Sequence, residues 1–212
     1  MKNILLSKNL KTTLYFKGMD NKLGITDLQE LELTEEKLGK VKAFHLYNQK
    51  LPKVGSFKSL SIIHKYLFEE LYDFAGKLRT VNLAKGDFQF APLSYLSSTI
   101  KTIDELKQST FEQIIEKYVE MNIAHPFREG NGRAMRIWLD AILKQEICKV
   151  IDWSLINKDD YLYAMIISPI EDNNLKYLLR AALREEVNNF TATIDASFAF
   201  EDLNYYKTKD LI

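Results

Sequence analysis

At 212 residues, with 46% hydrophobic and 12% aromatic side chains, the chain has enough apolar material for one compact core and does not belong with disordered proteins. Lysine plus arginine equals aspartate plus glutamate at 29 each, so no whole-protein field attracts a polyanion, and nucleic-acid binding is not expected. The 8 glycines and 4 prolines are few, which favours long helices over many short strands.

The N-terminal stretch "MKNILLSKNLKTTLYF" resembles no targeting segment. Its apolar run, at 4–6, is too short for a signal peptide. No stretch approaches the roughly 20 apolar residues of a membrane span, so no membrane partner is expected. The single cysteine, Cys148, has no disulfide partner and is expected to be a small buried hydrophobe. These features together predict a cytoplasmic protein.

The first predicted helix covers 27–49, after Thr26 as its N-cap, and ends before Pro52 and Gly55. The next is predicted to be capped by Ser59 and to end at Gly76, because apolar residues recur at helical spacing at 60, 63, 67, 71 and 74. Residues 78–93, "LRTVNLAKGDFQFAPL", have β-formers on both sides of Lys85-Gly86-Asp87, which predicts a β-hairpin. This is the only strand signal that the sequence offers.

Helices resume after Pro92. Positions 111, 114, 115, 118, 119 and 123 form one apolar face of a helix that ends before His125. The stretch "AMRIWLDAILKQEI" is apolar on nearly every side, as expected for a central helix. Shorter helices are predicted near 158–167, 172–188 and 193–202. The sequence therefore predicts a mainly α fold.

Residues 125–136, "HPFREGNGRAMR", concentrate reactive and anion-binding groups in one loop. Glycines allow a tight turn, after which the N–H groups at the start of a helix can converge on a phosphate. Arg133 and Arg136 are three apart and project from one side of the helix, and two guanidiniums imply more than one phosphate. Arginines at a helix N-terminus oppose the macrodipole, so bound negative charge is expected there.

Three further positions complete this interpretation. Glu129 could hold magnesium against phosphates, since magnesium takes one or two carboxylates plus phosphate oxygens. His125 could accept a proton from a hydroxyl, and Phe127 has no reactive group and is best explained as an anchor in the core. Taken singly, a His-Pro or Gly-Asn-Gly is usually a turn or a cap. Taken together, these residues fit one reaction.

The loop resembles the signature of Fic-domain proteins, His-Pro-Phe-x-Asp/Glu-Gly-Asn-Gly-Arg-x-x-Arg, at every specified position. The segments at 21–26 and 63–90 also look like that family. The resemblance implies a Fic-like helical bundle with a β-hairpin flap beside the active site. It would divide the chain into a catalytic domain at 1–190 and a C-terminal inhibitory helix and tail at 191–212, packed on the same domain.

The activity that the resemblance implies is transfer of AMP from ATP to a serine, threonine or tyrosine hydroxyl of a protein. His125 would be the general base and Glu129 would bind magnesium. The α- and β-phosphates would be held by Gly130, Asn131 and Gly132. Arg133 would hold the β-phosphate and Arg136 the γ-phosphate. Lys85 and Gly86, at the hairpin tip, are further candidates for contacts with ATP.

The target protein is expected to dock on the 78–93 flap, because an exposed strand edge can pair with an extended segment and hold its hydroxyl near His125. An ordinary packing element is an equally weighted alternative for this hairpin. The sequence allows a homo-oligomer. Two rival functions also stay open: phosphate transfer or another nucleotidyl transfer on the same scaffold, and a nucleotide-binding regulatory partner without catalysis.

The C-terminal segment "SFAFED" resembles the inhibitory motif Ser/Thr-x-x-x-Glu-Gly/Asn of one Fic class. Ser197 and Glu201 are four apart and would share a helical face. Glu201 would neutralise Arg136, while Asp202 departs from the motif and leaves the helix ending open. The alternative is a surface helix with an ordinary acid.

Beyond it, Tyr205 and Tyr206 lie in a polar tail expected to be mobile, where either phenol is a candidate for self-modification. His45 and His64 have no ligand spacing with His125, and both are expected to be packing or surface residues.

Overall fold

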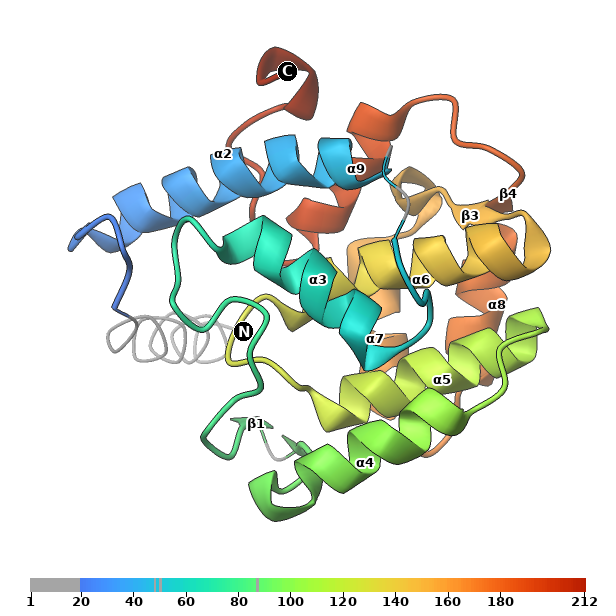
Figure 1. Cartoon of the computed structure of the whole chain (residues 1–212). Helices are drawn as coiled ribbons and strands as arrows, with labels where there is room; N and C mark the ends of the chain where they lie inside the picture. The colour runs from blue at the N-terminus through green and yellow to red at the C-terminus, as the bar shows by residue number, and fades with distance from the viewer. Residues whose placement is uncertain (1–19, 48, 50, 87) are drawn as a thin grey trace.

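A computed structural model describes residues 20–47, 49, 51–86 and 88–212. The N-terminal stretch considered for targeting and Asp87 lie outside these residues. Helices dominate the described chain, so the predicted mainly α fold is confirmed (Figure 1). The helices are α2 (Leu28–Tyr47), α3 (Phe57–Phe68), α4 (Leu93–Glu105), α5 (Phe111–Ala124), α6 (Asn131–Ile147), α7 (Lys158–Ile167), α8 (Asn173–Ala181) and α9 (Phe190–Ala199), with short 3-10 turns η1 (Trp153–Leu155) and η2 (Thr208–Asp210).

Helix α6 is the central helix, as its apolar sequence predicts. It packs against α2, α3, α5 and α9 (Figure 1). Trp138 and Leu139, in its middle, are fully buried. The Trp138 indole Nε1 donates to the Ser59 hydroxyl at 3.1 Å and to the Ser56 carbonyl at 3.2 Å, which fixes α6 against the start of α3. The first turn of α6, which carries the glycine loop, is therefore held on a rigid scaffold.

Helix α3 differs from its prediction at both ends. Ser56, and not Ser59, is the N-cap, and its hydroxyl accepts from the Ser59 N–H at 3.3 Å. The helix ends at Phe68, and turns replace the expected helical segment up to Gly76. Leu71 is nonetheless buried, because it packs into the core from the turn that follows α3. The apolar spacing therefore predicted the burial of Leu71 correctly, although α3 ends before it.

The strands are shorter and more numerous than the sequence predicts. In the 78–93 flap, β1 (Ala84–Lys85) pairs antiparallel with β2 (Phe88–Gln89). A second ladder, β3 (Val150–Ile151) with β4 (Leu183–Arg184), has no counterpart among the predictions. Two-residue strands are too short to show an alternating pattern. Since β4 uses residues assigned to the 172–188 helix, α8 ends at Ala181.

The end of α9 determines where Glu201 lies. The helix stops at Ala199, so Glu201 belongs to the turn after the helix and not to the predicted 193–202 helix. The Leu203 N–H donates to the Phe198 carbonyl at 3.3 Å and the Asp202 N–H to the Ala199 carbonyl at 3.1 Å, the two bonds of a Schellman motif. Asp202 has φ of 64°, the left-handed conformation that glycine or asparagine usually provides here. The departure at 202 therefore leaves the turn intact.

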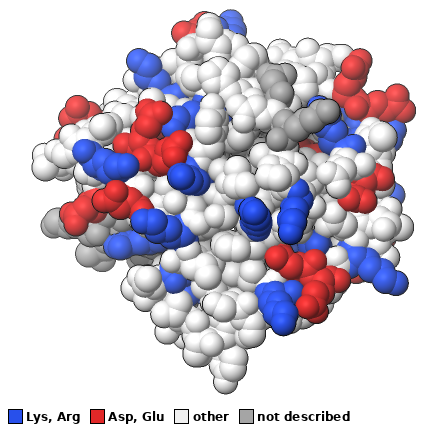
Figure 2. All heavy atoms as spheres, in the orientation of Figure 1, with Lys and Arg blue, Asp and Glu red and all other residues white. Residues whose placement is uncertain are grey.

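The surface shows no concentration of one charge on the face in view. Figure 2 shows acidic and basic side chains interspersed over it. Cys148 is exposed and not buried, because it caps α6 in a left-handed conformation, with φ of 55°. Over the part of the chain that the structure describes, no helix has both the length and the apolar character needed to cross a bilayer.

Candidate active site

The loop between α5 and α6 is closed by its own side chains. The Asn131 side chain accepts from the Phe127 N–H at 2.9 Å and donates to the Phe127 carbonyl at 2.8 Å. Phe127 is fully buried, as expected for an anchor, and its ring stacks on His64 at 3.8 Å between centroids. Because the Asn131 amide is used within the loop, the backbone N–H of this residue is the group that remains for an anion.

His64 holds the glycine loop through a hydrogen bond to the Glu129 carbonyl, and its sequence context does not predict this role. Its Nδ1 accepts from the Gly76 N–H at 2.9 Å, so its Nε2 carries the proton and donates to the Glu129 carbonyl at 2.7 Å. The pKa of His64 is lowered to about 3, mainly by burial and in part by the positive charge of Arg133, while the hydrogen bond to the Glu129 carbonyl opposes both. The neutral imidazole therefore joins the Gly76 turn to the glycine loop.

Two glycines allow close approach of other side chains at the start of α6. Gly130, the N-cap, has φ of 73°, and a Cβ there would lie 2.4 Å from the Phe68 ring. A Cβ on Gly132 would lie 2.4 Å from Oε1 of Glu201 and 2.9 Å from Arg136. The first N–H groups of a helix have no intrahelical acceptors. The space above Gly132 is therefore suited to an anion, and a carboxylate lies in it.

Glu201 bridges both arginines of the loop. One carboxylate oxygen lies 2.8 Å from Nη2 of Arg136, and the other lies 2.7 Å from Nε of Arg133. Ser197 also binds Arg136: its hydroxyl accepts from Nε at 2.7 Å, and its carbonyl accepts from Nη2 at 2.9 Å. Burial raises the pKa of Glu201, but the two guanidiniums outweigh burial and hold it below the usual value. Glu201 is therefore an anion in an anion site.

Arg133 is surrounded by three carboxylates. The sequence indicated Glu129 as a magnesium ligand and Glu201 as a partner of Arg136, and it gave no role to Glu35. Nη1 of Arg133 lies 2.6 Å from Glu35, its Nη2 lies 3.3 Å from Glu129, and its Nε contacts Glu201. Glu35, from α2, is also bound by the Tyr72 hydroxyl. Nothing in the charged sequence of α2 distinguishes Glu35 from its acidic neighbours.

Glu129 is a half-buried carboxylate near two other carboxylates, and the positive charge of Arg133 does not offset the combined effect of burial and these charges on its pKa. Burial raises its pKa to about 7, and the charges of Glu35 and Glu201 add to this against the opposing effect of Arg133. Its side chain is still 22% exposed beside the glycine loop. The described residues include no group of three or more metal-binding side chains placed to hold an ion. A magnesium ion at Glu129 would therefore take most of its ligands from phosphates and water.

His125 ends α5 in a left-handed conformation, with φ of 46°. Its ring stacks on Phe90 of the flap at 3.7 Å between centroids. Burial lowers the pKa of His125 to about 3, helped by the charges of Lys85 and Arg79, so the imidazole is neutral at pH 7 in this arrangement. Lys85 and Gly86 are themselves exposed at the hairpin tip, and Gly86 has φ of 63°.

The C-terminal tail is anchored, contrary to the expected mobility. The N–H groups of Tyr205 and Tyr206 donate to Glu36 of α2 at 3.1 and 3.0 Å. The buried Lys40 amine donates to the Tyr206 carbonyl at 2.6 Å and pairs with Glu36 at 2.8 Å. The Tyr205 side chain is nonetheless 51% exposed. The tail backbone is therefore bound to α2 while one phenol faces solvent.

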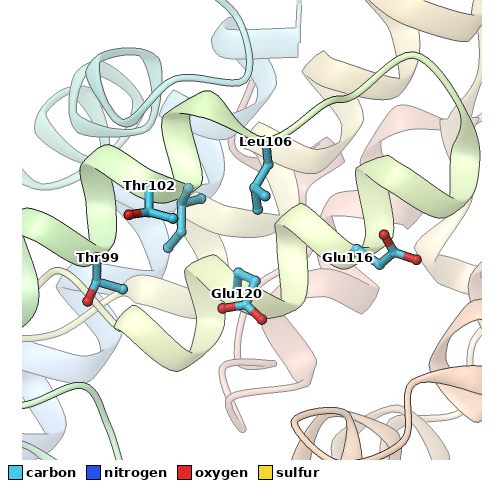
Figure 3. Close-up of a pocket in the computed structure, with 6 residues that line it drawn as sticks. Thr99, Thr102, Leu106, Glu116 and Glu120 are labelled. Carbon is cyan, nitrogen blue, oxygen red and sulfur yellow. The ribbon is translucent and has the colours of Figure 1, made fainter.

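A cavity of about 420 Å³ lies between α4 and α5, apart from this loop in the sequence (Figure 3). Figure 3 shows Thr99 and Thr102 on α4 and Glu116 and Glu120 on the neighbouring α5. Its lining residues are Thr99, Thr102, Ile103, Leu106, Glu116 and Glu120. None of them belongs to the 125–136 loop, and the two acids would repel a phosphate.

Comparison with known proteins agrees with this geometry. The Fic/DOC family model matches residues 56–143. The chain is 31% identical to the protein adenylyltransferase VbhT of Bartonella schoenbuchensis, over 82% of this chain and 38% of that protein. It is 30% identical to the probable protein adenylyltransferase Fic of Escherichia coli, over 58% of this chain and 66% of that protein. The chain thus spans less than two thirds of the length of either relative.

Solved structures share the fold. The BepC protein of Bartonella tribocorum, with bound AMPPNP, matches with a TM-score of 0.66 at 22% identity, over 82% of this chain and 98% of that chain. The N-terminal Fic domain of a putative cell filamentation protein of Bartonella quintana, with bound ADP, matches with a TM-score of 0.66 at 23% identity, over 77% of this chain and 89% of that chain. These similarities establish the arrangement of helices around the flap and the loop.

Proposed function

Since the chain belongs to the Fic/DOC family, we propose that it is a protein adenylyltransferase, which transfers AMP from ATP to a serine, threonine or tyrosine hydroxyl of a target protein. The observation that carries the proposal is the position of Glu201, whose carboxylate lies between two buried guanidiniums above Gly132. That place fits a phosphate as well as a carboxylate. The relatives named as adenylyltransferases support the same reaction.

In this mechanism the phosphates of ATP replace the Glu201 carboxylate. Arg133 binds the β-phosphate and Arg136 the γ-phosphate, while the backbone N–H groups of Gly130, Asn131 and Gly132 hold the α- and β-phosphates. Glu129 would hold magnesium, which neutralises phosphate charge when bound. The acceptor oxygen attacks the α-phosphorus, the bond to the β-phosphate oxygen breaks, and pyrophosphate leaves. His125, neutral at pH 7, takes the hydroxyl proton.

Residues 191–212 form the regulatory part of this proposal, on a catalytic domain at 1–190. While Glu201 occupies the two guanidiniums, the γ-phosphate has no binding partner, and ATP is held in a pose that does not align its α-phosphorus for attack. Ser197 contributes by keeping Arg136 turned toward Glu201. Protein in this state rests with low activity, and movement of the turn after α9 releases it.

The target is proposed to dock on the 78–93 flap. Strand β1 and strand β2 are exposed or half-buried, and Phe90 places the flap directly against the His125 ring. An extended target segment paired with this edge would bring its hydroxyl near the imidazole. Lys85 and Gly86, exposed at the tip, would contact ATP or the target. Transfer in the cytoplasm, by a monomer or a homo-oligomer, is consistent with this arrangement.

The test compares wild type, Glu201→Gly and the Glu201→Gly/His125→Ala double variant, with magnesium, a bacterial lysate, and ATP labelled on either the α- or the γ-phosphate. We expect Glu201→Gly to attach the α-label to protein faster than wild type, and loss of His125 to lower the rate by about 10²–10⁴-fold. Asp202→Asn, which neutralises the neighbouring exposed acid, is the matched control and keeps wild-type activity.

Two results contradict the proposal. Attachment of the γ-label instead of the α-label indicates a phosphotransferase, and α-label that does not depend on His125 removes its role as the base. Peptide mass spectrometry of the same reactions tests self-modification, for which AMP is expected on Tyr205 or Tyr206 in the Glu201→Gly variant. Unmodified tyrosines would end that part of the proposal without affecting the rest.

A further inference from the structure

Arg79, near the start of the 78–93 flap, is a buried arginine that donates hydrogen bonds to several backbone carbonyls. It is 3% exposed. Its Nε donates to the His125 carbonyl at 2.9 Å and its Nη1 to the Val81 carbonyl at 2.7 Å. Its Nη2 donates to the carbonyls of Ala91 and Ala124. One side chain therefore contacts the segments on both sides of the β1–β2 hairpin and the end of α5.

The end of α5 requires such a group. The last carbonyls of a helix have no intrahelical donor and carry the negative end of the macrodipole, which a cation stabilises. Arg79 supplies donors and charge to the carbonyls of Ala124 and His125, and its own N–H donates to the Pro126 carbonyl at 2.9 Å. His125 has φ of 46°, a backbone conformation that is costly for a residue with a side chain and persists only when its surroundings hold it.

The same guanidinium fixes the flap that covers the His125 ring. Val81 precedes the β1–β2 hairpin and Ala91 follows it, so two of the four carbonyls that Arg79 binds flank the hairpin. Phe90, next to Ala91, stacks on the imidazole. Displacement of Arg79 would therefore free the His125 backbone and the ring that packs on the His125 side chain at the same time.

We propose that Arg79 is a positioning residue, which holds the His125 imidazole and the flap in the geometry needed for proton acceptance while leaving nucleotide binding to the glycine loop and its arginines. This inference rests on the proposed function for the role of His125. Charge alone does not account for the contacts, because four carbonyls in different directions match the planar fork of a guanidinium and not the single ammonium of a lysine. Arg79→Lys therefore separates positioning from charge.

The experiment uses the full chain with Glu201→Gly as the parent, and adds Arg79→Met or Arg79→Lys. We expect kcat to fall on the order of 100-fold in both variants, because small displacements of a reacting group cost about that much. The Kd for ATP, measured by calorimetry, is expected to change much less than kcat, since the side chain of Arg79 donates to carbonyls at 81, 91, 124 and 125 and only the flap-tip contacts of Lys85 and Gly86 depend on it. Arg184→Met is the matched control, since this exposed arginine also donates to backbone carbonyls, those of Ala181 and Leu183, and keeps the parental kcat.

A second readout does not depend on catalysis. The groups whose charges act on His125 are Arg79, Lys85 and Glu201. In the nucleotide-free parent, NMR titration of the His125 ring is expected to show an upward shift of its pKa in Arg79→Met, and the amides of 83–90 are expected to exchange faster with solvent. These changes test the inference even if the parent transfers no AMP.

Three results overturn the inference. Parental kcat in Arg79→Lys shows that charge suffices. Loss of ATP affinity in proportion to kcat, together with a lower Tm, shows a general structural role. An unchanged His125 titration with unchanged amide exchange in Arg79→Met shows that Arg79 does not hold this part of the site.

Discussion

At the scale of single residues, His64 joins the Gly76 N–H to the Glu129 carbonyl through two hydrogen bonds, and only the neutral imidazole can make both. Its pKa of about 3 in the folded chain lies below the ordinary value of 6.5, so the unfolded chain takes up more protons between these values. The stability that this group contributes is complete above the ordinary value. It is lost as the pH falls toward the folded value.

We expect His64→Phe to lower the free energy of unfolding by about 2 kcal/mol near pH 7.5, because the buried Gly76 N–H and Glu129 carbonyl lose their partner. The difference from wild type is expected to shrink by about 2 kcal/mol near pH 5, since only wild type then loses the His64 contribution. Urea unfolding at both pH values measures this. His45→Phe, at an exposed position, serves as the control. If the loss of unfolding free energy in His64→Phe is the same at both pH values, the expected role of the neutral His64 is wrong.

The residues of the 125–136 loop could be identified from the sequence because they lie within one short segment and serve one chemistry. Glu35, His64 and Arg79 could not, because each acts on the loop from a different element through a contact distant in sequence. Glu35 and His64 lie in sequences typical of ordinary charged or packed helices, and Arg79 lies in the predicted hairpin segment with no feature that sets it apart. Only the folded chain brings the third carboxylate to Arg133 or the guanidinium to the end of α5.

At the scale of elements, the tail holds the end of α9 against α2. Thr208 is fully buried, and its N–H and hydroxyl both donate to Asp195 of α9, at 2.9 and 2.7 Å. Lys40 of α2 pairs with the same carboxylate at 3.2 Å. The turn that carries Glu201 lies between α9 and this tail, so its position depends on both attachments.

We expect Thr208→Val to loosen the tail, because the substitution keeps the shape and removes one hydrogen bond to a charged group, worth about 1.5 kcal/mol. Cleavage by trypsin after Lys207 and Lys209 is then expected to be about tenfold faster, since local opening limits cleavage. Mass spectrometry of timed digests measures the rate. Thr102→Val, at an exposed site on α4, is the control. Equal rates in all three proteins would show that the tail is held by other contacts.

The long helices followed from apolar spacing, and α7 has the predicted bounds. What failed were the features that depend on tertiary contacts. The two-residue strands of the β3–β4 ladder show no alternating pattern in the sequence, and β4 makes α8 shorter than predicted. Helix α3 ends at Phe68, although buried residues continue beyond it. Glu201 lies in a turn for the same reason, because the hydrogen bonds of residues 198–203, and not the four-residue spacing, decide where α9 ends.

At the scale of the whole molecule, the site contains opposing charges whose balance affects stability. Arg133 and Arg136 are 2% and 3% exposed. Glu201 pairs with both, and among the described residues it is the one carboxylate paired with Arg136, while Arg133 also pairs with Glu35 and Glu129. Removal of one partner from a buried ion pair leaves uncompensated charge and is destabilising. The chain without Glu201 should therefore gain more from a bound polyphosphate than wild type does.

We expect Glu201→Gly to have a lower Tm than wild type without nucleotide. With magnesium and ATP at about 100 times its Kd, the variant should gain about 2.7 kcal/mol, which corresponds to a rise in Tm of about 5–10 °C for a chain of this size. Wild type should show a smaller rise at the same ATP concentration. Calorimetric scans measure both values, with Asp202→Asn as the control. A rise in wild type equal to that in Glu201→Gly would contradict competition between Glu201 and phosphate.

The absence of a side chain at Gly132 limits how this chain could evolve toward constant activity. A methyl group there would intrude on the space that Glu201 fills, but the same methyl would also exclude a phosphate. A substitution of Gly132 therefore cannot displace the Glu201 carboxylate and still leave room for the phosphates of ATP. Escape is open through loss of Glu201 itself, or through positions that hold the carboxylate in place without lining that space, such as Ser197, Thr208 and Lys40. Naturally hyperactive forms of this protein should therefore carry changes at Glu201 or at the attachments of α9 and the tail, with the glycine loop unaltered.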